Sequence, residues 1–329
     1  MAQDPERRNV VVLLALAANL AVGVLKLGAG LLSGSGALLS EAAHSAGDCA
    51  TELLLLVALR RSEHPADQQH PFGYGKARYF WSLLAAVAIF VSGAAFSVFE
   101  GLHTILGGSE SDTMLWINYP VLALAFVFEG ISFRTAAHRM RDQSRRRRQT
   151  WRQYVRDPED PTVNSVTLED SAALIGIVVA FAGVGLHQLT GSSIWDGVAS
   201  LVIGALLLFV AFVLARGCAG LLIGKQADRP LLEALERRLE EQDEVDDVVD
   251  LLTMMVGVGH VLLCVRVDFV NSLSAGDLET ACVRVADVLR AEFTELDEIF
   301  IQPASAADRG VRERVTQRYG RPLADEPRE

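Results

Sequence analysis

The sequence predicts an α-helical membrane protein with six transmembrane helices, followed by a small α+β domain. Half of the 329 residues are hydrophobic and the mean hydropathy is +0.27, which exceeds what one soluble core of this length needs. Several apolar segments are long enough to cross about 30 Å of hydrocarbon. From residue 225 onward the sequence becomes charged, with short stretches of helical and strand periodicity.

The apolar segments are predicted to be membrane helices, at roughly 20 residues per crossing. The first continues to full spanning length without a small-residue cleavage site, so a membrane helix is expected there rather than a removed signal. An even number of crossings places both termini on one side. The segments lie near residues 9–31, 36–59, 78–106, 113–138, 163–188 and 195–222.

Of the connections between the membrane segments, only those on one side carry Lys or Arg. Arg7, Arg60 and Lys76 lie on that side, as does the arginine-rich segment 139–156, whereas SGSG, GGSESDT and HQLTGSS contain no Lys or Arg. The positive-inside rule therefore predicts a multi-pass protein with both termini cytoplasmic. Segment 139–156 adjoins two membrane helices, so contact with anionic lipid is expected and nucleic-acid binding is not.

Residues 1–224 are the predicted six-helix membrane domain, and residues 225–302 are the predicted small domain. In the latter, Asp228 is a predicted N-cap ahead of Pro230. Two strands are predicted on either side of the turn Gly257–Gly259. In the second strand, apolar residues from Val261 to Phe269 alternate with polar ones. An amphipathic helix and a short strand complete the order helix, strand, strand, helix, strand. Residues 303–329 are poor in apolar residues and predict a mobile tail.

The most informative feature is a polar stripe in the second membrane segment. Residues i and i+4 share a helix face, so His44 and Asp48 can close on one small cation. Glu41 and Glu52 extend the same stripe within an arc of about 80°. A carboxylate in mid-bilayer costs about 2.5 to 3.5 kcal/mol on insertion scales, so it normally faces a partner, a cavity or an ion. The alternative is that these groups only hold the bundle together.

A second acidic pair, Glu169 and Asp170, lies in the fifth membrane segment. Zinc prefers four ligands in a tetrahedron. His44, Asp48 and Asp170 supply three predicted ligands, and Glu169 or a water molecule the fourth. The alternative for Glu169 is a solvated residue at a helix end.

Other functional classes find little support in the sequence. No nucleophile–base pair, phosphate loop or cofactor motif is present, so the chain is not expected to be an enzyme. The four cysteines form no CxxC pair and no metal-type spacing, and we expect reduced thiols. The net charge of −11 arises mainly from the C-terminal part.

Four motifs together resemble the cation diffusion facilitator family of divalent-metal transporters. They are SGSGALLSEAAHSAGD, HPFGYGKARYFW, LEDSAALIG and SIWDGVASLVIGALL. The resemblance implies a homodimeric exporter in a membrane, with the cell (plasma) membrane expected, that moves zinc from the cytoplasm in exchange for protons. It also implies a cytoplasmic C-terminal domain of ferredoxin-like fold. Family metal ligands carry over to His44, Asp48 and Asp170.

The sequence departs from the family pattern at several positions. The usual fifth-helix histidine is Val166, so Glu169 is the candidate substitute ligand. A peripheral loop site is represented by Asp67 and His70, but Tyr74 replaces the next expected histidine. In the C-terminal domain, Arg266, Ile301 and Pro303 stand at customary metal positions, and His260 is expected to be structural.

Two questions remain open at this level. A harder, oxygen-rich site would favour Mn²⁺, and Fe²⁺ or Co²⁺ are further alternatives to Zn²⁺. The chain could also be a non-transporting partner subunit or metal sensor.

Glu100, His103 and Glu129 are secondary candidates for proton relay.

Overall fold

The computed structural model describes residues 5–107, 114–146 and 161–319. Its contacts divide the chain into two compact units. The first comprises the chain up to Glu63 and Ala77–Gly220, and the second comprises His64–Lys76 and Leu221 onward. The loop after the second membrane helix therefore groups with the C-terminal residues, whereas the sequence places the boundary at residue 224 alone.

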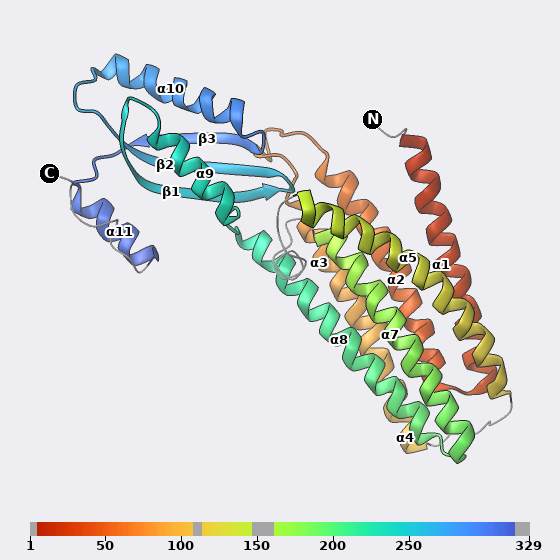
Figure 1. Cartoon of the computed structure of the whole chain (residues 1–329). Helices are drawn as coiled ribbons and strands as arrows, with labels where there is room; N and C mark the ends of the chain where they lie inside the picture. Colours follow the sequence, from red (N-terminus) through yellow and green to blue (C-terminus); the bar gives the residue numbers. More distant parts are fainter. Residues whose placement is uncertain (1–4, 108–113, 147–160, 320–329) are drawn as a thin grey trace. The chain divides into compact units, whose positions relative to one another are not determined.

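The first unit is a bundle of long helices that lie side by side (Figure 1). Six helical spans in the described residues are long and apolar enough to cross a membrane, which confirms the predicted fold class. The helices are α1 (Pro5–Ser33), α2 (Gly36–Ser62), α3 (Ala77–Ala88), α4 (Phe96–Gly107), α5 (Asn118–Arg146), α7 (Pro161–Thr190) and α8 (Ile194–Ile223). A π-helical segment, η1 (Ile89–Ala95), joins α3 to α4 in one span, and a short 3₁₀ turn, η2 (Leu115–Ile117), precedes α5.

The start of α2 is fixed by hydrogen bonds to α8. Ser35 is the N-cap, and its side chain accepts from the Leu38 amide. Asp196 Oδ1 accepts from Ser35 Oγ at 2.8 Å, and Asp196 Oδ2 accepts from the Ala37 amide at 3.3 Å. Because Asp196 is buried, this contact sets the position of α2, the helix that carries the predicted metal ligands.

We call the end of the bundle with the α1–α2 turn the Gly34 end, and the opposite end, where α2 finishes, the Ser62 end. Gly34 has φ 69°, in the left-handed region that favours glycine, and its amide donates to the Gly30 carbonyl. The turn therefore ends α1 and lets α2 return antiparallel to it.

The second unit contains a three-stranded mixed sheet (Figure 1). Its elements are α9 (Arg229–Glu240), β1 (Val245–Gly257), β2 (His260–Phe269), α10 (Ala275–Glu292) and β3 (Leu296–Pro303). Strand β2 pairs antiparallel with β1 and parallel with β3. The predicted order of elements is confirmed, and so is the N-cap at Asp228. Val261, Leu263, Val265, Val267 and Phe269 are buried, as their alternation predicts.

Residues 303–319, the described part of the predicted mobile tail, differ from that prediction, and residues 320–329 lie outside the described residues. The described part contains helix α11 (Arg309–Tyr319), whose Val311 and Val315 are buried against Val249 of β1. These two valines are four residues apart and share one helix face, which gives an otherwise charged segment a small apolar contact.

Loop 64–76 packs on the tip of the β1–β2 hairpin within the second unit. A Cβ atom at Gly75 would lie 2.5 Å from the Val256 carbonyl oxygen and 2.7 Å from Gly257 Cα. Lys76 Nζ lies 3.6 Å from Met254 Sδ. The Met255 amide also donates to the Lys225 carbonyl at 2.9 Å. Two connections to membrane helices thus converge on residues 254–257.

Candidate metal site in the helix bundle

The predicted polar stripe on α2 lies inside the bundle. His44 Nε2 and Asp48 Oδ2 are 3.5 Å apart, and the two residues are only 2% and 9% exposed. Neither His44 Nε2 nor Asp48 Oδ1 has a hydrogen-bond partner among the described residues. The helix therefore presents an imidazole nitrogen and a carboxylate side by side with free lone pairs, which is the chemistry that binds a borderline cation such as Zn²⁺.

The two acidic residues of α7 have different surroundings. Glu169 is buried, and its Oε1 has no hydrogen-bond partner in the described part of the chain. It lies in the third turn of α7 rather than at a solvated helix end. Asp170 Oδ2 accepts from Ser132 Oγ of α5 at 2.8 Å. Val166, one turn earlier, is half-buried and offers no ligand atom.

The four predicted ligands form one electrostatic cluster. The Asp48 carboxylate interacts with those of Glu169 and Asp170, and also with Glu129 and Lys26. Among the described residues, however, no three His, Cys, Asp or Glu side chains are close enough together to hold a metal ion. The structure thus brings the acidic residues of α2 and α7 near one another, but the four side chains are not close enough to bind one ion together.

A buried lysine that was not among the predicted site residues lies beside this cluster. Lys26 of α1 is fully buried and donates to Glu41 Oε2 at 3.0 Å and Ser45 Oγ at 2.9 Å. Glu129 Oε1 is 4.0 Å from Lys26 Nζ. The signal was available in the sequence, because a lysine in the middle of a membrane span is rare and normally paired.

Glu52 and the three candidates for proton relay have identifiable contacts in the bundle. Glu52 Oε1 accepts from Asn19 Nδ2 of α1 at 2.7 Å. Of the three candidates for proton relay, Glu129 faces Lys26, and Glu100 interacts electrostatically with His103 and Asp196. The His103 ring stacks on Phe99 with 6.2 Å between ring centroids. These contacts place Glu129 in the same cluster as Asp48 and place Glu100 near the Gly34 end.

In loop 64–76, Tyr74 bonds to the carboxylate that would have served a peripheral metal. Its hydroxyl donates to Asp67 Oδ2 at 2.8 Å, and Asp67 Oδ1 accepts from the His70 amide at 2.7 Å. The Tyr74 hydroxyl is the main cause that holds the pKa of Asp67 below its ordinary value. The loop is therefore organised by its own hydrogen bonds.

Of the three positions at which the family resemblance would expect a metal ligand in the C-terminal unit, Arg266 belongs to a salt-bridge cluster. Asp250 is fully buried at its side chain, and its Oδ2 accepts from Arg266 Nη1 at 2.7 Å and Arg318 Nη1 at 2.8 Å. His260 Nδ1 lies 2.8 Å from Asp297 Oδ1 at the surface. Arg266 thus puts a fixed positive charge where a metal ligand would be needed.

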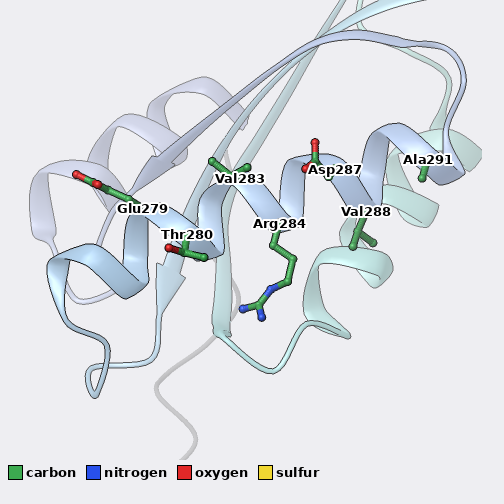
Figure 2. A pocket seen from close by; sticks show the side chains of 7 residues that line it. All are labelled: Glu279, Thr280, Val283, Arg284, Asp287, Val288 and Ala291. Carbon is green, nitrogen blue, oxygen red and sulfur yellow. The ribbon is translucent and has the colours of Figure 1, made fainter.

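A shallow hollow on the outer face of α10 has a different character (Figure 2). Val283, which is 62% exposed, lines it together with Arg284 and Asp287. The side chains along this single helix do not converge on a point. The lining residues are Glu279, Thr280, Val283, Arg284, Asp287, Val288 and Ala291.

Comparisons with known proteins identify the family of the chain. Residues 12–223 match the model of the cation efflux transmembrane domain. Over 259 residues the chain is 31% identical to the human "Proton-coupled zinc antiporter SLC30A9, mitochondrial", covering 79% of this chain and 45% of that protein. It is 31% identical to "Metal tolerance protein C4" of Arabidopsis thaliana, with 78% and 56% coverage.

The match to a bacterial relative covers more of that relative's length. The "Manganese efflux system protein MneP" of Bacillus subtilis is 23% identical over 309 residues, which are 92% of this chain and 97% of that protein. The chain spans about half the length of the zinc antiporter and the metal tolerance protein. Because the family model covers most of the chain, including every predicted metal ligand, the chain is a multi-pass membrane protein that belongs to the cation efflux family of transporters, which are not enzymes.

Proposed function

We propose that the chain exports a divalent metal ion, with Zn²⁺ as the first candidate, in exchange for protons. The observation that carries this proposal is the buried His44–Asp48 pair, whose Nε2 and Oδ1 atoms have no hydrogen-bond partner among the described residues. A buried unpartnered polar atom costs about 1–3 kcal/mol, so such a pair is expected to have a ligand at some point in its cycle. A relative named as a proton-coupled zinc antiporter supports zinc and protons.

In this proposal Asp170 and Glu169 complete the site from α7. Their helix packs beside α5, whose Ser132 holds one Asp170 oxygen and leaves the other for the ion. The side chains would have to close around the ion from their present positions. Glu169 then takes the role that the missing histidine at position 166 has in the family pattern.

Proton exchange follows from the chemistry of the ligands. A neutral imidazole and an ionised carboxylate bind a metal, whereas their protonated forms do not. Protons that reach the site from the Gly34 end would therefore displace the ion. We place both termini in the cytoplasm, because the connections at the Ser62 end carry the arginines and lysines. The cell membrane and a homodimer remain part of the proposal.

The experiment is zinc flux in liposomes under a pH gradient, followed with separate zinc and pH dyes. Asp48→Ala should reduce metal affinity more than about 100-fold, since even outer-shell changes cost 10–100-fold. Glu169→Ala should do the same if this residue is a ligand. Asp142 is an exposed carboxylate on α5, so Asp142→Ala is the matched control, and this variant should transport zinc normally. Zinc flux without proton flux would exclude antiport.

A manganese exporter is the second candidate function. It is favoured by the number of carboxylates near Asp48, since hard oxygen ligands suit Mn²⁺, and by the relative named as a manganese efflux protein. Competition decides between the metals, because Mn²⁺ abolishing zinc flux at equal concentration would reverse the order. If the reconstituted protein moves neither metal, the partner-subunit or metal-sensor alternative gains support.

A further inference from the structure

The ammonium group of Lys26 lies in an oxygen cage formed by two other helices. Glu41 Oε2 and Ser45 Oγ of α2 are 3.0 and 2.9 Å from Nζ, and Glu129 Oε1 of α5 is 4.0 Å away. Lys26, Glu41 and Ser45 are at most 2% exposed, and Glu129 is 7% exposed. The cage thus holds one monovalent cation that belongs to the protein itself.

The cage is built by close packing as well as by charge. A Cβ atom at Gly176 of α7 would overlap Glu41 Oε1, and one at Gly23 of α1 would come within 3.2 Å of Ser45 Cβ. Glu41 Oε1 has no hydrogen-bond partner in the described residues, so only one of its two oxygens is used by Lys26. The carboxylate is therefore seated between α1 and α7 with binding capacity to spare.

The cage lies next to the proposed metal site, on the path toward the Gly34 end. Glu41 and Ser45 flank His44 in the sequence, and Asp48 follows one turn later. At 1.5 Å per residue, the Lys26 contacts are centred roughly 4–5 Å closer to the Gly34 end than the His44–Asp48 pair. An ion that leaves the pair toward that end would meet these oxygens first.

We propose that Lys26 fills a second cation position, formed by Glu41, Ser45 and Glu129, and thereby prevents a divalent ion from being trapped there. The inference rests on the proposed function and adds a residue that determines how many ions the bundle holds. Without the ammonium, two carboxylates and a hydroxyl would form an all-oxygen position suited to a hard divalent ion. Transport requires binding weak enough for the ion to leave, which a second strong position would oppose.

The test counts Mn²⁺ ions bound per purified full-length chain by elemental analysis after gel filtration. Lys26→Met should bind one ion more than wild type, while Lys26→Arg, which keeps the charge, should match wild type. The double variant Lys26→Met/Glu41→Gln should lose the additional ion. The inference is overturned if Lys26→Met binds no additional ion, or if Lys26→Arg gains one as well.

A second variant keeps the inference testable if Lys26→Met does not fold. Glu41→Gln leaves the Lys26 charge without its main partner beside His44, so zinc affinity should fall at least about tenfold. The double variant should recover that affinity, and an unchanged affinity in Glu41→Gln would contradict the inference. The ion count of Lys26→Met is a difference from wild type, so it does not depend on the outcome for Asp48→Ala. Loss of the wild-type ion in Asp48→Ala tests the proposed function itself.

Discussion

The helix bundle and the C-terminal unit both bury carboxylates, but they satisfy them differently. In the C-terminal unit, Asp250 receives two arginines, Arg266 and Arg318, at 2.7 and 2.8 Å. In the bundle, Asp48 interacts with three further carboxylates and with Lys26 as its cation. In both units one oxygen of the buried carboxylate has no hydrogen-bond partner among the described residues, namely Asp48 Oδ1, Glu169 Oε1 and Asp250 Oδ1. The difference therefore lies in the charge of the neighbours.

The difference separates structural from functional charge. A buried carboxylate that is paired with arginine can stabilise a fold, because each group supplies what the other lost from water. Ionised carboxylates grouped without enough cations repel one another, and a bound proton or a cationic ligand can supply the missing charge. This contrast supports the proposed ion site in the bundle, whereas in the C-terminal unit arginines balance the buried carboxylate.

The largest effect is expected from removing the paired carboxylate. Asp250→Ala should lower the free energy of unfolding of the C-terminal unit by about 3 kcal/mol, because breaking a buried ion pair leaves its partners uncompensated. Arg318 lies on α11, so hydrogen exchange of residues 309–319 in the full chain should rise most. Metal binding by the bundle should stay as in wild type.

The matched control is Asp297→Ala at the surface of the same unit. Its partner His260 is exposed, so the loss should remain below about 1 kcal/mol. Equal losses in the two variants would remove the distinction between buried and exposed pairs. A loss of metal binding in Asp250→Ala would instead show that the salt bridge acts on the transport site.

A smaller effect tests close packing rather than charge. Gly176 in the bundle leaves room for a carboxylate, whereas Gly75 leaves room for the hairpin backbone. Gly75→Ala should destabilise the loop contact by about 1–3 kcal/mol, the usual range for overpacking. Hydrogen exchange should rise in residues 64–76 and 254–260. Gly276→Ala, whose new Cβ meets no atom within 4 Å, is the control and should show neither change.

The smallest effect concerns the exposed carboxylate of loop 64–76. Since the Tyr74 hydroxyl lowers the pKa of Asp67 in the folded loop, this hydrogen bond stabilises the loop above the ordinary aspartate pKa of about 3.9. The stabilisation should be lost as the pH falls through the depressed value. Tyr74→Phe should raise the pKa of Asp67, measured by carbon NMR of labelled aspartate. An unchanged pKa would contradict the assigned cause.

The sequence alone determined most of the architecture. The apolar segments predicted the membrane helices because only a helix satisfies its backbone groups within hydrocarbon, and periodicity predicted the order of elements after residue 225. The i, i+4 spacing also predicted that His44 and Asp48 lie on one face, since helix geometry is local. At Arg309–Tyr319 composition failed, because two valines sufficed to place a helix against β1.

Contacts between distant residues were decided only by the tertiary structure. Spacing along α2 says nothing about Lys26, which lies 15 residues before Glu41 and meets it only because α1 packs antiparallel to α2. The same holds for Asp250 with Arg318, and for Gly75 with the hairpin. The sequence predicts that a lysine in a membrane span has a partner, because an unpaired charge there is costly. Which carboxylate pairs with it depends on helix packing, which brings together residues far apart in the sequence.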